Sequence, residues 1–422
     1  MQGRVDAAVT LIVGVAVLAG CTSAPSAPPE TGVPTSGPTA VASQTPTEAP
    51  PETAPPTSVP APPAPAGPWK PVADHDSIGA SQWLHVVWSG RRFVATGTAL
   101  SGGGTFGTSK DGRSWKTAPS GGTTGGPIQI TAGSGEVVAI GTLDNKTASW
   151  HSTDGIHWTW HLKVFPKALG ADDVVTVNDL IPIPGGWLAV GADSETCFVS
   201  CAPSPIRGLV WTSTNGLDWT RLANQASLKG GGLNAVAALD GGYVAAGDAG
   251  GRAAFWSSVD GKAWTRVADD PSFGTTGAGA GVQVVGLASR DGTIVAVGME
   301  QTGGDSAPLV RAWRSTDGQA WSEASVEGAL GGQVFSVAAT ATGFLATGPS
   351  GDTSCLGGIW ASTDGSSWQC AASDPAFAGF GPYAAAGSAD VEVAVGLTDS
   401  GCEAEGACGD GLPGDIWWRP IP

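Results

Sequence analysis

Seven polar or aromatic residues stand at the second position of short apolar segments spread along the chain. They are His85, Gln129, Asn178, Asn234, Gln283, Phe335 and Tyr383. Imidazole, amide and aromatic groups suit the binding of sugars or peptides, because they combine hydrogen bonds with flat apolar faces. The same side chains could instead satisfy the backbone of neighbouring segments, which is the usual role of a buried polar group. The sequence therefore predicts a candidate binding ring and leaves both roles open.

The apolar segments that carry these residues contain few groups for catalysis. Asp179 is the only acidic residue that we expect on them, and Tyr243 and Tyr383 are the only tyrosines of the chain. Glycoside hydrolysis normally needs two carboxyl groups that face the same bound sugar. No catalytic set is identified, so the sequence argues against an enzyme without excluding one.

A repeated hairpin must position the candidate ring. Five copies have a Trp, an Asp-Gly or Asn-Gly turn and a second Trp, as in Trp150 to Trp158 and Trp313 to Trp321, and an earlier copy that ends at Trp115 lacks only the first Trp. Asp-Gly favours a hairpin turn, since Gly adopts positive φ without steric cost and the Asp oxygen accepts turn N–H groups. The turn residues are Asp111, Asp154, Asn215, Asp260, Asp317 and Asp364.

A second short segment, which ends in Gly, precedes each hairpin, as in Phe93 to Gly97 and Ile294 to Gly298. Seven such segments occur, each with a further apolar segment upstream. Their β-branched, aromatic and small residues indicate strands. Four strands repeated seven times predict an all-β chain with a seven-bladed β-propeller of four-stranded blades. Residues 69–72 would add the missing fourth strand to the last blade beside Ile416–Trp418, so that the two ends close the ring.

The hairpin resembles the Asp-box (BNR) repeat of sialidase-like propellers, although Gly follows Asp one residue earlier than in that family's pattern. The resemblance covers residues 69–418 and implies that the six turn residues are structural and lie away from the binding face. It also implies an arginine triad, a Tyr nucleophile and an acid, and none of these converge in this sequence. We therefore expect a non-catalytic glycan- or protein-binding or scaffold module. The alternatives are a carbohydrate-active enzyme, such as a sialidase-like glycoside hydrolase, and an assembly factor.

The start of the chain predicts export and a lipid anchor. Residues 1–20 have the short apolar run of a signal peptide, and Leu18-Ala19-Gly20-Cys21 resembles the lipobox of bacterial lipoproteins, which implies lipidation of Cys21. An ordinary signal peptide is the alternative. Residues 21–68 are rich in Pro and Thr and predict a disordered linker, and residues 69–422 form the propeller. The expected location is the extracytoplasmic side of the cell membrane, with a glycan or an envelope protein as partner.

Cysteine usage and charge complete the prediction. The six remaining cysteines suit disulfides in an exported chain, with local pairing of Cys197 with Cys201, Cys355 with Cys370 and Cys402 with Cys408. A zinc site is the weaker alternative, because no histidine stands near them in the sequence. The net charge of −17 argues against nucleic acid as a partner. We expect a monomer with no cofactor and no metal.

Overall fold

A computed structural model describes residues 66–73, 78, 81–165, 173–195, 207–276, 281–301, 308–329, 331–351, 353–398 and 414–421. All described residues belong to one compact unit, Ala64–Pro422. The predictions for Cys21, Cys197, Cys201, Cys402 and Cys408 lie outside the described residues. Within the described ranges, no helix has the length and apolar character that crossing a bilayer requires.

The described residues form 28 strands, which confirms the prediction of an all-β chain built from four-stranded sheets. Two complete sheets come first along the chain: β2 (Ser81–Trp88), β3 (Phe93–Ala99), β4 (Gly104–Ser109) and β5 (Lys116–Pro119), then β6 (Gly125–Gly133), β7 (Glu136–Leu143), β8 (Lys146–Ser152) and β9 (Thr159–Leu162). Two more follow: β10 (Asp173–Ile183), β11 (Gly186–Glu195), β12 (Arg207–Ser213) and β13 (Thr220–Arg221), then β14 (Gly231–Leu239), β15 (Gly242–Ala249), β16 (Arg252–Ser258) and β17 (Thr265–Arg266).

The next two four-stranded units join into one eight-stranded sheet. They are β18 (Gly281–Arg290), β19 (Thr293–Gln301), β20 (Leu309–Ser315) and β21 (Ser322–Val326), then β22 (Ser336–Thr340), β23 (Gly343–Thr347), β24 (Ile359–Ser362) and β25 (Ser367–Cys370). Their outer strands β21 and β25 pair in parallel, with Val326 opposite Trp368. The repeat pattern did not predict this pairing, because it depends on the contact between two units. Short 3-10 helices lie in the connections: η1 (Ala226–Leu228), η2 (Pro271–Phe273), η3 (Thr353–Cys355) and η4 (Pro375–Phe377).

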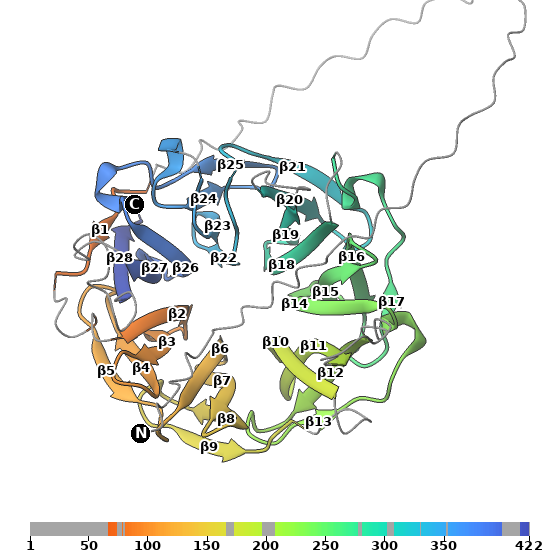
Figure 1. The fold of residues 1–422 in the computed structure, drawn as a ribbon, viewed down its shortest axis with the longest axis horizontal. Coiled ribbons are helices and arrows are strands. Elements are labelled where there is room, and N and C mark those ends of the chain that lie inside the picture. Colours follow the sequence, from red (N-terminus) through yellow and green to blue (C-terminus); the bar gives the residue numbers. More distant parts are fainter. Residues whose placement is uncertain are drawn as a thin grey trace, which may run out of the picture. The chain divides into compact units, whose positions relative to one another are not determined.

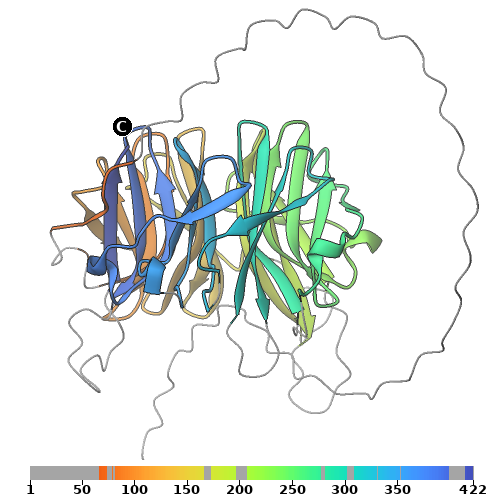
Figure 2. The same ribbon diagram turned by 90° about the horizontal axis from the view of Figure 1, so that it is seen from above.

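The last sheet is built from both ends of the described unit, as predicted. It consists of β26 (Phe380–Gly387), β27 (Val391–Thr398), β28 (Gly414–Pro420) and β1 (Lys70–Pro71). β1 pairs with β28 in antiparallel fashion, with Lys70 opposite Trp418 and Pro71 opposite Trp417. This closes the ring of sheets that Figure 1 shows, in which the first strand of every unit lies nearest the centre. Figure 2 shows the sheets standing side by side, as the blades of a β-propeller do.

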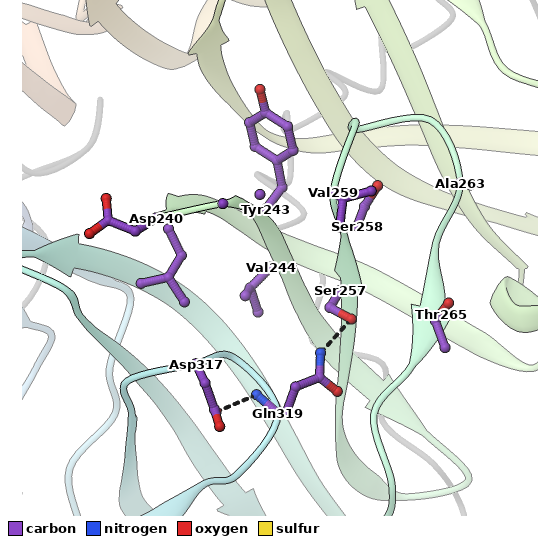
Figure 3. A pocket seen from close by; sticks show the side chains of 13 residues that line it. Asp240, Tyr243, Val244, Ser257, Ser258, Val259, Ala263, Thr265, Asp317 and Gln319 are labelled. Atoms are coloured by element: carbon purple, nitrogen blue, oxygen red, sulfur yellow. Dashed lines mark hydrogen bonds between the residues drawn. The ribbon is translucent and has the colours of Figure 1, made fainter.

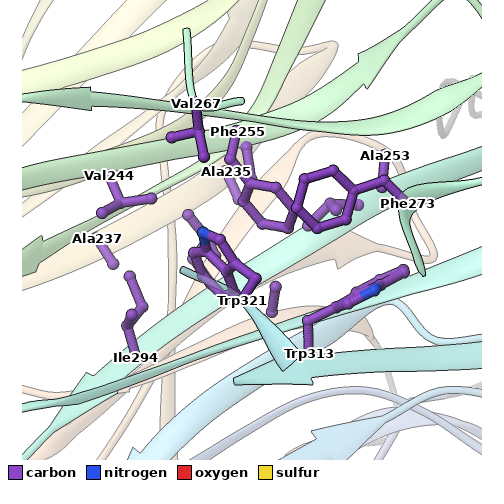
Figure 4. Packing of buried hydrophobic residues seen from close by; sticks show 14 of the residues in the cluster. Ala235, Ala237, Val244, Ala253, Phe255, Val267, Phe273, Ile294, Trp313 and Trp321 are labelled. Atoms are coloured by element: carbon purple, nitrogen blue, oxygen red, sulfur yellow. The ribbon is translucent and has the colours of Figure 1, made fainter. Parts of the chain in front are cut away.

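Tryptophans of the repeated hairpin fill the spaces between neighbouring sheets. The first Trp is fully buried in all five hairpins that have one, as Trp150, Trp256 and Trp313 show. In two hairpins the second Trp stacks on a Phe of the preceding sheet: Trp158 stacks on Phe106, and Trp321 lies 4.1 Å from Phe255 between ring centroids, in the cluster of Figure 4. Removing a buried aromatic of this kind costs about 3–5 kcal/mol of stability. The core is thus a set of inter-sheet clusters.

One predicted disulfide is present in the described residues. Cys355 at the end of η3 is bonded to Cys370 at the end of β25. This confirms the local pairing for these two residues and ties a connection of the unit to its outer strand.

Candidate functional site

The inner strands share a β-bulge, which sets the geometry of the candidate site. In β2 the register shifts between Trp83 and His85, so that Leu84 is the extra residue. The same shift occurs in β6, β10, β14, β18 and β26. Because a bulge breaks the two-residue alternation of side chains, it changes which inner-strand residues share a face of the sheet.

The repeated glycine of each second strand allows this bulge; the strand was predicted to end at this glycine, but β3, for example, continues past Gly97 to Ala99. A Cβ atom on any of these glycines would lie between 1.9 and 2.2 Å from the carbonyl oxygen two residues before the bulge. Gly97 faces the carbonyl of Gln82 in this way, and Gly298 faces that of Gln283. Only glycine fits so close to another backbone. The members of the set are Gly97, Gly141, Gly191, Gly247, Gly298, Gly348 and Gly396.

The register corrects the alignment of the seven predicted residues, which do not share one structural position. Asn178, Asn234 and Tyr383 are bulge residues, and Phe335 stands at the matching place, just before β22. His85 and Gln129 come one residue after the bulge, whereas Gln283 comes two residues before it. The alignment from sequence was wrong here, because the inner strands have no motif that marks the bulge. The bulge residues that sequence reasoning missed are Leu84, Ile128 and Val285.

Around the ring, the bulge residues separate into an apolar arc and a polar arc. The apolar arc consists of Val285, Phe335, Tyr383, Leu84 and Ile128, in consecutive units of the closed ring. The polar arc consists of Asn178 and Asn234. All of these side chains except the buried Leu84 are at least partly exposed, and Ile128 is 42% exposed. We call this set the bulge ring.

The two asparagines link neighbouring sheets. Asn178 Nδ2 donates to the carbonyl of Leu233 in the next sheet at 2.8 Å, and Asn234 Nδ2 donates to the carbonyl of Val284 at 2.9 Å. Each acceptor immediately precedes the next bulge. These contacts show the alternative role for the amide nitrogens of Asn178 and Asn234, namely satisfying a neighbouring backbone.

Two aromatic residues form the opposite part of the bulge ring. The rings of Phe335 and Tyr383 lie 4.9 Å apart between centroids, at an interplanar angle of 30°. They belong to adjacent units, and the Tyr383 backbone carbonyl accepts a hydrogen bond from Thr347 Oγ1 at 3.1 Å. Desolvation raises the pKa of the Tyr383 hydroxyl, so that it stays a neutral hydrogen-bonding group. The pair is a partly exposed aromatic surface on a rigid frame.

Asp179 and His85 lie one residue after the bulge in their strands, and burial shifts the pKa of both side chains. Desolvation raises the pKa of Asp179 to about 7, although the backbone N–H groups of Val236 and Leu180 donate to its two oxygens. Desolvation also lowers the pKa of His85 to about 4, which keeps its imidazole neutral. The sequence predicted Asp179 as the only acidic residue on the inner strands. This prediction was wrong, because β10 begins at Asp173.

The Asp-box residues lie at the other end of the sheets, beside the turns between first and second strands. Asp317 Oδ1 accepts hydrogen bonds from the backbone of Gln319 and Ala320 and from Ser315 Oγ. The two backbone N–H groups hold the pKa of Asp317 below its usual value. Asn215 Oδ1 makes the matching contacts in its own turn. Asp111, Asp154, Asp260 and Asp364 likewise accept backbone N–H groups of their turns.

The described residues offer little for metal chemistry. Among them, no group of three or more His, Cys, Asp or Glu side chains is arranged to hold a metal ion. The connections between residues 192 and 208, 299 and 309, and 397 and 415 fall mostly outside the described residues.

No protein-family model and no curated protein matches the chain. Among solved structures, the chain is similar to the SapL1 lectin in complex with alpha methyl fucoside, at 15% identity and a TM-score of 0.44 over 70% of this chain and 97% of the lectin. A Trypanosoma rangeli sialidase mutant displaying trans-sialidase activity matches at 14% identity and a TM-score of 0.42, over 72% of this chain and 55% of the sialidase. The chain thus spans about half the length of that sialidase. At identities and TM-scores this low, the likeness says nothing about ligand or reaction.

Proposed function

We propose that the protein is a non-catalytic binding module that recognises a glycan at the bulge ring. One observation carries this proposal: the ring combines the aromatic pair Phe335 and Tyr383 with a polar arc at Asn178 and Asn234. A sugar ring presents apolar C–H faces and polar hydroxyl edges on one small molecule. Aromatic rings suit the faces, and the amide oxygens suit the hydroxyls.

The proposal includes the setting of this module. Each four-stranded unit counts as one blade and the eight-stranded sheet as two, which gives seven blades. Residues 1–20 direct export, and Cys21 carries the lipid. Residues 21–68 form a linker that holds the propeller away from the outer surface of the cell membrane. The protein is a monomer. The lipobox-like tetrapeptide and the Pro-rich composition of the linker support this part.

A carbohydrate-active enzyme is the second candidate, because one observation favours it. Asp179 has a raised pKa of about 7, as a general acid requires. Two facts weigh against it. The backbone N–H groups of Val236 and Leu180 engage both carboxylate oxygens of Asp179. At the six corresponding positions of the other inner strands, all of them described, no acidic residue stands; these residues are His85, Gln129, Ala235, Gly286, Ser336 and Ala384.

A glycan array probed with the full chain tests the proposal. We expect binding to one class of glycan, weakened about tenfold or more by Tyr383→Ala, since an aromatic anchor of a binding site contributes at least about 1–2 kcal/mol. Tyr243→Ala is the matched control, because Tyr243 is the other tyrosine and lies at the Asp-box end of its sheet. Binding that survives Tyr383→Ala, or no binding to any glycan, would contradict the proposal.

The same protein is assayed for turnover of a fluorogenic sialidase substrate. We expect none. If the protein turns the substrate over and Asp179→Asn abolishes this activity, the protein is an enzyme and not a non-catalytic binding module.

A further inference from the structure

Each Asp-box turn packs against the second strand of the preceding sheet, and a space lies beside this contact. A Cβ atom on Gly155 would lie 2.8 Å from Val94 Cγ2, and one on Gly318 would lie 2.6 Å from Val244 Cγ2. We call the space beside such a pair an inter-sheet slot. The slots are at the opposite end of the sheets from the bulge ring.

Arginine side chains of the protein itself occupy two of these slots. In the slot next to Gly155, Arg91 Nη2 donates to the carbonyls of Gly135 at 2.9 Å and Thr153 at 3.1 Å. The aliphatic stem of Arg92 lies against Gly155, with its Cδ 3.2 Å from a Cβ built there. The slot next to Gly365 is filled by Arg314.

Arg314 combines the two contacts in one side chain and lies on β20, whereas Arg91 and Arg92 lie in the turn between β2 and β3. Its Nε donates to the carbonyl of Asp364 at 2.9 Å, and its stem lies 3.6 Å from a Cβ built on Gly365. In the first slot the Arg91 guanidinium bonds to turn carbonyls and the Arg92 stem covers the Asp-box glycine, whereas in the second slot Arg314 makes both contacts. The slots have a built-in chemical fit for an arginine side chain.

The slot next to Gly318 has no arginine among its described lining residues; Leu239 Cδ2 lies 3.6 Å from a Cβ built on Gly318, and no guanidinium of the described residues bonds to the turn carbonyls there. Gly241 and Gly242 precede Tyr243 there, where Arg91 and Arg92 precede Phe93 in the first sheet. Ser257 stands at the place of Arg314, since each directly precedes the Asp-box serine of its hairpin. The result is a cavity of about 300 Å³ between the sheet of β14 to β17 and the next Asp box (Figure 3).

The lining of this open slot is acidic and polar. Asp240 and Asp317 contribute carboxylates, and none of the lining residues, all of which are described, carries a positive charge. Asp317 Oδ1 accepts the backbone N–H of Gln319 in its turn. The side-chain Nε2 of Gln319 donates to Ser257 Oγ at 2.6 Å, as Figure 3 shows. Val259, on the rim, is 83% exposed and offers an apolar contact for a neighbouring residue of a ligand.

We propose that the open slot binds the guanidinium of an arginine side chain in a partner peptide. The bound group takes the place that Arg314 and Arg91 take in their slots. It donates to the carbonyls of Thr316 and Asp317, the counterparts of Thr153 and Asp364, and faces the carboxylates of Asp240 and Asp317. This site goes beyond glycan binding in both its position and its ligand.

The test titrates the full chain with acetyl-Gly-Arg-Gly-amide and follows the methyl NMR signals of Val244 and Val259. The citrulline and lysine counterparts of the peptide are titrated in parallel, because citrulline keeps the shape without the charge and lysine keeps the charge without the fork. We expect saturable shifts with the arginine peptide alone. Ser257→Arg should abolish them by filling the slot from within, as Arg314 does. Thr212→Arg, at the matching position of β12 but in another slot, is the control and should leave them intact.

Asp317→Asn gives a second test that preserves the fold, because Asn215 already makes the same turn contacts in its sheet. We expect the affinity for the arginine peptide to fall about tenfold at low salt through the lost charge. The proposal is overturned if the arginine peptide causes no saturable shift, if Ser257→Arg leaves binding unchanged, or if the lysine or citrulline peptide binds equally well. Phe335→Ala in the bulge ring should not alter this binding, which separates failure of the slot from failure of the glycan site.

Discussion

At the scale of single residues, the pKa and the hydrogen bonds of Asp179 depend on the sheets around it. Its carboxyl group is desolvated, and its oxygens accept backbone N–H groups from its own strand and from the next sheet. The sequence singled out Asp179 but could not predict its environment. The adjacent polar pair Asn178 and Asp179 was the available signal, since two polar residues in a row break the alternation of a strand, as a bulge does.

The raised pKa of Asp179 predicts a pH-dependent cost to stability. The carboxyl group binds a proton more tightly in the folded chain, where its pKa is about 7, than in the unfolded chain, where its pKa is near 3.8. Its contribution to stability therefore falls as pH rises from about 4 to about 7 and is constant above. We expect Asp179→Asn to gain stability relative to the wild type between pH 5 and pH 8, by at most about 3 kcal/mol, because about two pH units separate pH 5 from the folded-state pKa of about 7.

Urea unfolding of both proteins at the two pH values measures this change, and other titrating groups cancel in the comparison. A difference in stability that is the same at pH 5 and pH 8 would show that Asp179 does not titrate as described.

At the scale of elements, the paired first and second strands explain why the Gly-ended segment recurs. The sequence showed seven repeated glycines, at which the second strands were predicted to end, but gave no reason for them. In the structure, each one accommodates a carbonyl of the bulged inner strand. The predicted strands were therefore right in existence and order, whereas the register of their polar residues was not. Register depends here on a backbone contact between two strands, which side-chain patterning does not encode.

The strand pair β26 and β27 offers a matched test of this contact. A Cβ atom on Gly396 would lie 2.2 Å from the carbonyl oxygen of Gly381, whereas one on Gly381 would have its nearest neighbour at 4.0 Å. We expect Gly396→Ala to lower the free energy of unfolding by about 1–3 kcal/mol through overpacking, and Gly381→Ala to change it by less than about 1 kcal/mol. Thermal melting checks both variants, and equal effects would mean that the bulge can relax.

At the scale of the whole molecule, self-comparison of the sequence predicted the four-stranded units and the joining of both ends through Trp69–Val72. These features repeat, so each copy reinforces the others. What the repeat could not predict are the differences between copies. Arg314, Ser257 and Thr212 occupy one repeated position, yet only their packing against the next sheet shows which slot is filled and which is open. The proposed arginine site therefore depends on residues that differ between the copies of the repeat and not on residues that all copies share.

The proposed lipid anchor determines where such sites would meet a partner. Two acyl chains on Cys21 contribute about 0.8 kcal/mol for each buried methylene, which is sufficient for stable attachment. We therefore expect the wild type in the membrane fraction and labelled by a palmitate analogue in a bacterial host that processes lipoproteins. Cys21→Ser should be unlabelled and released. Cys355→Ser is the control, because it removes the disulfide partner of Cys370 and leaves Cys21 intact, so it should remain attached. Persistence of Cys21→Ser in the membrane fraction would replace the lipid by another means of attachment, and the linker would then no longer set the distance between the propeller and the membrane.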